Sequence, residues 1–381
     1  MYKTFFDEQE NMEVTDVRWK IFSVLVMLIL LAVEGYGASL EPFSVPYLVS
    51  SLKNLDSLEF CGELVPREVP GVRERLEKEL LLTIWDRPQV ILWLKRSRRY
   101  FPQLEKMLQE NKMPDDLKYV AIVESALRPH AGSGKGAVGF WQFMVDTGRK
   151  YGLVINDRTD ERRNFFASTR AAIRYFNDLH KLLGTWTLAA AAFNMGEEGL
   201  QAEIMVQETR DYYRLYLSLE TQRFIFRILS AKLIFDDPTK FGFSLSDEDY
   251  YSTLSYDQIN IDCFQEIPIQ IVAQAAETDF KVIKDLNPEL RGHYLVAGNH
   301  NILIPKGVSE NFHTRYKSLL KNYLSKRKER IYIVKKGDNL SSIAAQFDIP
   351  LAALIIWNRL ELNHMIYPGD RLVIYPKREN N

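Results

Sequence analysis

The sequence predicts a mainly α-helical domain followed by small α+β modules. Between Val72 and Phe193, apolar residues recur at the spacing of helices that bury one face. From Tyr251 to Lys306 the pattern changes to short alternating runs without a long helix. The chain has 381 residues, of which 46% are hydrophobic and 26% charged, and this length and balance predict two or three globular domains.

Residues 1–37 are expected to be a signal peptide or an N-terminal anchor. Residues 21–33 form a strongly apolar run without any charge, which follows Arg18 and Lys20 and precedes the mostly small residues of 35–38. The run has 13 residues, whereas a helix that crosses a membrane needs about 20, which favours a signal peptide. We therefore expect an exported protein of the periplasm or cell envelope, associated with the membrane if this segment is retained.

Helices that build a scaffold are expected on both sides of a central motif. The region from Val72 to about Gln109 has a helical pattern whose tryptophan and leucine positions suit a core. Thr169–Leu179 and Thr187–Phe193 are also helical, and the second of these is almost wholly small and apolar. We expect this second helix to be buried and to deliver Asn194 at its end, where Gly196 turns the chain.

The segment from Pro114 to about Leu127 is predicted to be a helix that carries a catalytic acid. Pro114 suits the first position of a helix. Glu124 occupies a place in the apolar stripe of this helix where an apolar residue is expected. Because burial raises the pKa of a carboxyl, Glu124 is suited to donate a proton near neutral pH. The alternative is a buried glutamate that pairs with an arginine such as Arg128.

A glycine-rich loop follows this helix. Its glycines, at positions 132, 134, 136 and 139, allow the backbone to approach another segment or a ligand closely. Trp141 and Gln142 come next, and an aromatic plane beside an amide suits a sugar ring with hydroxyl and acetamido groups. A phosphate-binding loop is the competing interpretation, but Lys135 is followed by Gly136 instead of Ser or Thr, and no strand precedes it.

Three short motifs resemble those of the soluble lytic transglycosylase domain of glycoside hydrolase family 23. They are Glu124-Ser125, Gly139-Phe140-Trp141-Gln142 and Ala192-Phe193-Asn194-Met195-Gly196. Enzymes of this family have a lysozyme-like fold and cut the glycan strand of peptidoglycan. The resemblance implies that Glu124 is the catalytic residue. It also implies that the substrate is bound by Ser125, Gly139, Trp141, Gln142 and Asn194.

The chain departs from the family pattern at three positions. Phe193 stands where the family usually has Tyr, and Phe224 replaces another common Tyr. Glu198 replaces what is often glycine. These changes affect the expected positioning of the substrate but leave Glu124 in place.

Two C-terminal segments look like copies of one repeat. Gln274 aligns with Gln346, and Asn287 aligns with Asn358 when a gap of one residue is allowed. The first copy, within residues 251–306, lacks a clear opening strand and the glycine-aspartate pair of the second. We therefore predict that it is a degenerate version of the same module.

The second copy, residues 331–376, resembles a LysM module, a small βααβ unit that binds glycans containing N-acetylglucosamine. The resemblance places the glycan against the loop after the first strand and the loop before the last strand. The corresponding residues are Gly337, Asp338, Asn339, Leu340, Met365, Ile366, Tyr367, Pro368 and Gly369. The alternative is a packing or oligomerisation module. Residues 307–330, between the two copies, are predicted to be a basic helical linker.

Composition excludes some classes of partner. The net charge of -1 offers no basic surface for nucleic acid. The six His and two Cys show no spacing typical of a metal site, so neither a metal nor another cofactor is expected. Cys61 and Cys263 are expected to be unpaired, with a disulfide between them as the alternative.

The sequence therefore predicts a lytic transglycosylase whose lysozyme-like domain spans residues 38–245. The resemblance implies that Glu124 first protonates the bond between N-acetylmuramic acid and N-acetylglucosamine. It then accepts a proton while a 1,6-anhydro ring closes. One alternative is a hydrolase similar to goose-type lysozyme, with a second carboxylate among Asp160, Glu161, Glu197 and Glu220. The other is a non-catalytic scaffold that binds peptidoglycan.

Overall fold

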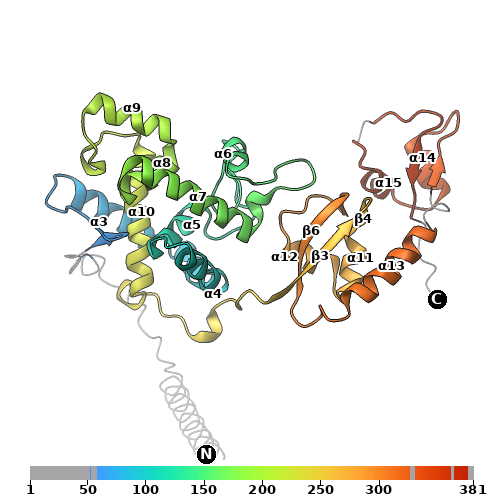
Figure 1. Ribbon diagram of the computed structural model, residues 1–381, viewed down its shortest axis with the longest axis horizontal. Coiled ribbons are helices and arrows are strands. Elements are labelled where there is room, and N and C mark those ends of the chain that lie inside the picture. The colour runs from blue at the N-terminus through green and yellow to red at the C-terminus, as the bar shows by residue number, and fades with distance from the viewer. Residues whose placement is uncertain (1–51, 53–57, 327–330, 362–363, 376–381) are drawn as a thin grey trace, which may run out of the picture. The chain divides into compact units, whose positions relative to one another are not determined.

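The computed structural model describes residues 52, 58–326, 331–361 and 364–375 (Figure 1). The segment expected to be a signal peptide or anchor, 1–37, lies outside these residues. In the described ranges, no single helix is long and apolar enough to cross a membrane. Helices α14 (Leu340–Gln346) and α15 (Leu351–Asn358) reach the necessary length and apolar composition only as a joined pair, and they bend by 109° at the break between them.

Eight α-helices form the first described domain, as the sequence predicted for this part of the chain (Figure 1). They are α3 (Val72–Trp85), α4 (Arg87–Glu110), α5 (Lys118–Ser125), α6 (Val145–Lys150), α7 (Phe165–Leu183), α8 (Trp186–Met195), α9 (Glu197–Gln207) and α10 (Leu219–Asp236). A two-stranded hairpin of β1 (Glu59–Phe60) and β2 (Glu63–Leu64) precedes them. Helix α10 is central, because it packs against α3, α5 and α8.

Helix α8 is buried, as its composition predicted. The Thr185 side chain caps its first turn by accepting a hydrogen bond from the Leu188 N–H at 3.3 Å. The four alanines 189–192 have no exposed surface. Because their side chains are small, α7 and α10 can each pack closely against α8. Gly196, with φ of 93°, ends the helix directly after Asn194 and Met195.

The helix that carries Glu124 is shorter than predicted. Instead of reaching Leu127, α5 ends at Ser125, and a short 3-10 turn, Asp115–Leu117, precedes it. Ala126 and Leu127 both have left-handed backbone conformations, with φ of 54° and 56°. The Ala126 N–H closes the helix with a bond of 2.8 Å to the Ile122 carbonyl. Glu124 thus lies in the last turn of α5, directly before the chain changes direction.

The second domain contains the first copy of the repeat, and it has the opening strand that the sequence analysis did not find. Its elements are β3 (Tyr256–Cys263), β4 (Ile267–Pro268), α11 (Ile269–Ala275), α12 (Phe280–Leu286), β5 (Tyr294–Leu295), β6 (Gly298–Pro305) and α13 (Phe312–Lys326). Strand β3 pairs with β6 in antiparallel register, from Tyr256 opposite Pro305 to Cys263 opposite Gly298. The prediction that this copy lacks a clear first strand is therefore wrong. In β3 the buried Ile259, Ile261 and Cys263 alternate with exposed polar residues, which is the pattern of a half-buried strand, so the sequence carried a signal that the sequence analysis overlooked.

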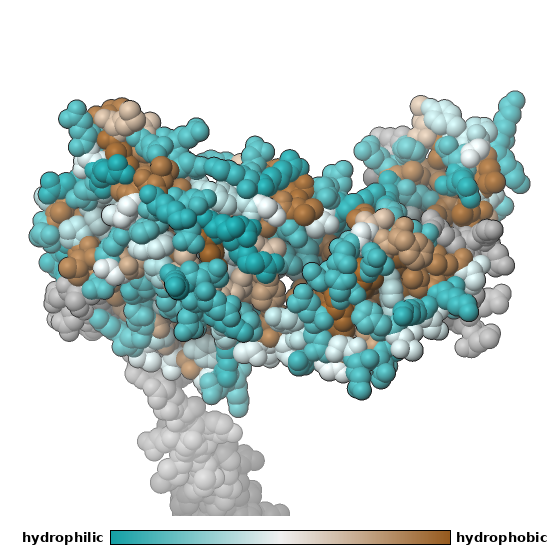
Figure 2. Space-filling model, viewed as in Figure 1, coloured by the Kyte–Doolittle hydropathy of each residue, from teal (hydrophilic) through white to brown (hydrophobic). Residues whose placement is uncertain are grey.

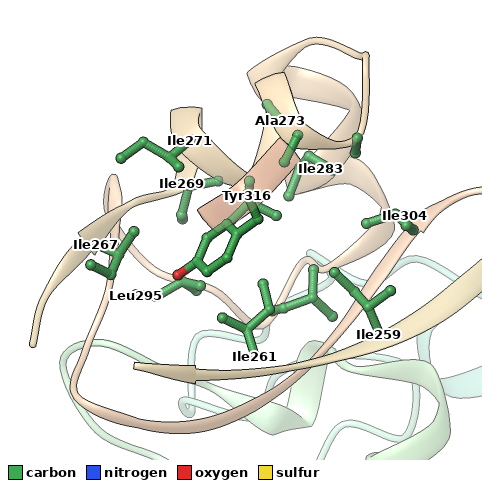
Figure 3. Packing of buried hydrophobic residues seen from close by; sticks show 14 of the residues in the cluster. Ile259, Ile261, Ile267, Ile269, Ile271, Ala273, Ile283, Leu295, Ile304 and Tyr316 are labelled. Carbon is green, nitrogen blue, oxygen red and sulfur yellow. The ribbon is translucent and has the colours of Figure 1, made fainter. Parts of the chain in front are cut away.

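Helix α13, which the sequence analysis treated as part of a linker, belongs to this second domain. Phe312 and Tyr316 lie in its buried hydrophobic cluster, and Tyr323 packs against the edge. Figure 3 shows the Tyr316 ring among isoleucine side chains from the strands and from α11. The amphipathic pattern of this helix thus reflects a face that is buried in the core.

The LysM-like unit at the C-terminal end has the predicted order of elements. It consists of β7 (Ile331–Ile333), α14 (Leu340–Gln346), α15 (Leu351–Asn358) and β8 (Arg371–Val373), and its two strands pair in antiparallel register. Its small core includes Val334, Ile343, Leu354 and Leu372.

The aligned asparagines confirm the internal repeat, because they make the same contacts in the two copies. Asn287 donates to the carbonyls of Ile283 and Leu303, and its side-chain oxygen accepts from the Leu303 N–H, all at 2.8 Å. Asn358 donates to the carbonyls of Leu354 and Val373 and accepts from the Val373 N–H. In each copy the asparagine fastens the second helix to the last strand.

Cys61 and Cys263 are both free thiols, as predicted. Figure 2 shows a face on which hydrophilic residues predominate and hydrophobic residues are exposed in separate patches. Among the exposed hydrophobic residues are Met205 of α9, Tyr216 near the end of that helix, and Met365 and Tyr367 in the C-terminal module.

Candidate active site

Glu124 has the electrostatic environment of a proton donor. Its carboxyl lies in the last turn of α5 and keeps only part of its surface exposed. Burial raises its pKa from the ordinary value of 4.5 to about 8, against a lowering by Arg227 and with a further rise from Glu220. At neutral pH the carboxyl is therefore protonated. Arg128, the partner that the alternative interpretation suggested, does not act on it; its side chain donates to the Ser125 carbonyl.

Helix α10 places both charged neighbours of Glu124. Glu220 and Arg227 are seven residues apart, which is about two helical turns, so they lie on the same face of α10. This face packs on α5, and the Arg227 guanidinium donates to the Val123 carbonyl at 3.3 Å. The sequence analysis did not identify Arg227, because a charge inside a helical pattern gives no sign of the distant residue that it faces.

Ser125 joins the end of α5 to the glycine-rich loop. It is 3% exposed, and its hydroxyl lies 2.8 Å from the Phe140 carbonyl and 3.1 Å from the Ala121 carbonyl. The resemblance implied that Ser125 binds the substrate, whereas in the structure its hydroxyl bonds to the backbone. Ser125 fixes the loop beside Glu124.

Gly139 is required by the close approach of two backbone segments. Its φ is 86°, and a Cβ atom at this position would lie 1.8 Å from the Arg162 carbonyl oxygen. Arg162 in turn donates from its guanidinium to the carbonyls of Gly136 and Phe143, at 2.9 and 3.1 Å. Asp160 pairs with this guanidinium at 2.9 Å, and both side chains are buried. The sequence analysis missed this ion pair, which shapes the loop from outside.

Trp141 is placed differently from the expectation. Its side chain is 1% exposed, and its indole N–H donates to the Thr169 hydroxyl at 3.1 Å. It packs edge-on against Phe176 and Phe193, at centroid distances of 6.2 and 6.4 Å. Trp141 therefore belongs to the core and does not offer the open aromatic face that the sequence analysis expected for a sugar.

Gln142 uses its amide protons within the loop. Its Nε2 donates to the carbonyls of Ala131 and Gly139, at 3.1 and 2.8 Å. Its backbone is left-handed, with φ of 48°, and the side chain is partly buried. The group that it retains for a substrate is its side-chain carbonyl oxygen.

Asn194 lies at the end of α8, as predicted, and faces α10. Its side-chain oxygen accepts a hydrogen bond from the Thr221 hydroxyl at 2.9 Å, which leaves its amide protons for a ligand. Phe193 stacks on Phe176 with a centroid distance of 4.5 Å and an interplanar angle of 6°. Phe224 is 1% exposed. The two Phe residues that replace the family's Tyr are thus packing residues here.

Of the four carboxylates that the sequence suggested as a second acidic group, three form hydrogen bonds or ion pairs with other residues. Asp160 is paired with Arg162, and Glu161 accepts the Val154 N–H at 2.7 Å. Glu197 accepts from Lys150 and from the Tyr175 hydroxyl. Only Glu220 contributes to the pKa of Glu124, and it is exposed, with Lys135 of the loop 3.7 Å away.

The two loops predicted to bind glycan in the C-terminal module lie side by side. The Val334 N–H donates to the Asp370 carbonyl, and the Gly369 N–H donates to the Val334 carbonyl, both at 2.8 Å. Several polar groups of these loops are internal: Asp338 accepts from the Tyr332 hydroxyl, and Asn339 caps α14.

Leu340 and Ile366 pack against the core of the module, while Met365 and Tyr367 are 71% and 60% exposed. The backbone at Gly337 and Gly369 has φ of 92° and 101°, as turns require, and Pro368 precedes the second of these glycines. Of the nine predicted residues, Met365 and Tyr367 thus offer apolar surface to a ligand.

Comparison with known families matches three consecutive parts of the chain. Residues 102–215 match the transglycosylase SLT domain. Residues 257–321 match the LysM-like domain of the lytic transglycosylase MltD, and residues 332–374 match the LysM domain. The match to 257–321 includes most of α13, in agreement with its packing in the second domain.

Two curated proteins are similar to this chain with the same sequence identity and the same coverage. The chain is 30% identical over 293 residues to proteins named membrane-bound lytic murein transglycosylase D from Escherichia coli strain K12 and from Escherichia coli O6:H1. The alignment covers 73% of this chain and 64% of each relative, so the chain spans a little under two thirds of their length.

Proposed function

The chain carries a transglycosylase SLT domain followed by two LysM-type domains, and from this we propose that it is a lytic murein transglycosylase. Its substrate would be the glycan strand of peptidoglycan. The observation that carries the proposal is the position of one partly buried carboxyl, Glu124, whose pKa of about 8 keeps it protonated at neutral pH. A carboxylic acid in this state is able to protonate a leaving oxygen.

The proposed reaction uses Glu124 twice. It donates its proton to the oxygen that links N-acetylmuramic acid to N-acetylglucosamine, and the bond from this oxygen to the anomeric carbon breaks. The acetamido group of the muramyl sugar stabilises the positive charge on that carbon. The Glu124 carboxylate then removes the proton from the 6-hydroxyl, whose oxygen attacks the anomeric carbon. A 1,6-anhydro ring forms, Glu124 regains its proton, and no water is consumed.

Neighbouring residues would hold the sugar and the acid in position. Asn194 has free amide protons and Gln142 a free amide oxygen, so both are able to bind hydroxyl or acetamido groups. Ser125 and Gly139 would act on the substrate indirectly, because they fix the loop next to Glu124. Met365 and Tyr367 of the C-terminal module would contact the glycan strand and keep the enzyme on its polymer.

A hydrolase is the second candidate, and it is favoured by one observation. Glu220 is near enough to Glu124 to affect its pKa and is exposed, so it is placed where a carboxylate that activates water would be needed. Two acids in one site allow hydrolysis if water reaches the anomeric carbon before the 6-hydroxyl does. The two candidates differ in their products.

Mass spectrometry of the fragments released from purified peptidoglycan separates these candidates. The transglycosylase predicts 1,6-anhydromuramyl ends, which disappear when Glu124→Gln is used. Reducing muramyl ends that disappear with Glu220→Gln would establish the hydrolase. A folded wild-type chain that binds peptidoglycan but releases no fragments would establish a binding scaffold. Fractionation of cells that express the full chain tests the proposed location in the periplasm or envelope.

A further inference from the structure

A charged cluster behind Glu124 has no role in the function described so far. Glu79 of α3 is 3% exposed and accepts two hydrogen bonds from Arg223 of α10, at 2.6 and 3.0 Å. Arg227 lies one turn further along α10. A cavity of about 300 Å³ is lined by these three side chains together with Trp93 and Val123. The cluster thus connects α3 and α10 to the residue that precedes Glu124.

Arg227 is influenced by both Glu124 and Glu79. Burial and the charge of Arg223 lower its pKa, while Glu124, Glu79 and Glu220 raise it. Its guanidinium is held in place by the hydrogen bond of 3.3 Å to the Val123 carbonyl. A guanidinium keeps its charge even when it is partly desolvated, so Arg227 is a fixed positive charge next to the acid.

We propose that Arg227 is a positioning residue for Glu124, and that the Glu79–Arg223 ion pair sets how strongly the charge of Arg227 acts on that carboxyl. The proposal rests on the function proposed above. It explains how one carboxyl serves as acid and then as base. Burial favours the protonated form, and the carboxylate left after the first step is stabilised by the fixed cation until it takes the next proton.

Other charged groups lie around this unit, and one of them, Asp86 before α4, lines the same cavity as Glu79, Arg223 and Arg227. Arg227 and Glu220 of α10 act on Glu124, and Arg96 of α4 donates to the Ala126 carbonyl beyond it. At the opposite end of α5, Asp115 and Asp116 are paired with Lys118 and Lys232. Glu79 and Arg223 are therefore the pair whose two charges can be removed separately behind Arg227.

Separate removal of these two charges has opposite expected effects. Glu79→Gln removes a negative charge, so the Glu124 carboxylate is stabilised and the acid loses its proton at lower pH. Arg223→Met removes a positive charge and moves the same titration to higher pH. Both variants lose the same ion pair, so a purely structural role would change both in the same direction.

The experiment measures fragment release from peptidoglycan between pH 5 and 10 for the full chain and its variants. We expect the apparent pKa of the alkaline limb of the kcat/KM profile to fall by roughly 0.5 pH units in Glu79→Gln. In Arg223→Met the same apparent pKa should rise by a similar amount. Arg227→Met moves the limb up by about 1 pH, and Arg227→Lys restores most of the wild-type position. Glu77→Gln, which removes the carboxylate of a more exposed pair with Arg73 on the same helix, leaves the limb unchanged.

The double variant Glu79→Gln with Arg223→Met distinguishes an effect of charge from an effect of disturbed folding. It removes both charges, so the limb returns close to the wild-type pH even though the ion pair is absent. Shifts of the two single variants in the same direction, or no shift in either, would overturn the proposal. A carbon-13 NMR titration of the Glu124 carboxyl, assigned with Glu124→Gln, reads the same shifts without activity. If the wild type releases no fragments, the proposed function fails, while the titration still tests Arg227.

Discussion

Glu124 and the glycine-rich loop beside it belong to one sequence motif, but their polar groups have different partners. Burial raises the pKa of the Glu124 carboxyl and the charge of Arg227 lowers it, and the result is a carboxyl that is protonated at neutral pH. In the loop, Trp141 donates into the core, and Gln142 donates to loop carbonyls. Gly139 is fixed against Arg162. Under the proposed function, this region therefore consists of one reactive group and a frame that holds it.

This difference has a physical basis. A catalytic acid needs a site where its protonated form is favoured, and such a site requires neighbours that do not move. The hydrogen bond from Ser125 to the Phe140 carbonyl and the core position of Trp141 provide that rigidity. Substitutions of the acid should therefore change activity without loss of stability, and substitutions of the frame should mainly lower stability, with smaller effects on activity.

Glu124→Gln tests the reactive side of this comparison, and its effect is expected to be the largest. The amide keeps the shape of the side chain but has no proton to donate. We expect fragment release to fall by about 10³-fold or more, which is within the range of a general acid that acts in two steps. The far-UV circular dichroism spectrum should match that of the wild type. Activity within about tenfold of the wild type would mean that another group supplies the proton.

Gly139→Ala tests the frame. A methyl group at this position meets the Arg162 carbonyl oxygen at 1.8 Å, on a backbone with φ of 86°. We expect a loss of about 3 kcal/mol or more in the free energy of unfolding, measured with urea. Gly134→Ala in the same loop is the control, because its Cβ meets no atom within 4 Å. Equal stability of the two variants would contradict the role assigned to Gly139.

The pH dependence of stability distinguishes the acid from the frame in another way. The pKa of Glu124 is raised from 4.5 to about 8 by burial, so folding binds a proton between these pH values. The contribution of this proton to the free energy of unfolding is therefore fully present below about pH 4.5, and it is lost as the pH rises to about 8. Glu124→Gln removes this penalty, and its Tm should exceed that of the wild type by roughly 5 °C more at pH 8 than at pH 5. Glu77→Gln should show no such pH-dependent gain.

Ser125→Ala has the smallest expected effect. It removes the hydroxyl that joins α5 to the Phe140 carbonyl, which leaves a buried acceptor without this partner. We expect a loss of about 1 kcal/mol in the free energy of unfolding and a modest fall in kcat, since Glu124 is less firmly held. Ser133→Ala, which removes an exposed hydroxyl that accepts from the Ala137 N–H in the same loop, is the comparison for loss of a solvent-exposed hydrogen bond. A rise in KM with unchanged stability would instead indicate that Ser125 binds the substrate.

The sequence predicted the order of the elements well because local rules govern it. The caps, the apolar stripes of α5 and α8, and the turns at Gly196 and Gly369 are all set by residues a few positions apart. The repeat was visible because Asn287 and Asn358 make equivalent contacts. Strand β3 was missed, since a strand is stabilised by pairing with β6, about 40 residues away.

The sequence by itself determined that an acidic residue lies in an apolar helix next to a glycine-rich loop, because both features follow from spacing. Only the tertiary structure decided which groups these residues contact and how far they are buried. It buried Trp141, turned Ser125 toward Phe140 and brought Arg227 of α10 next to Glu124. The physical reason is that burial and Coulomb interactions depend on distance in space, and residues 124 and 227 are about a hundred positions apart in the chain.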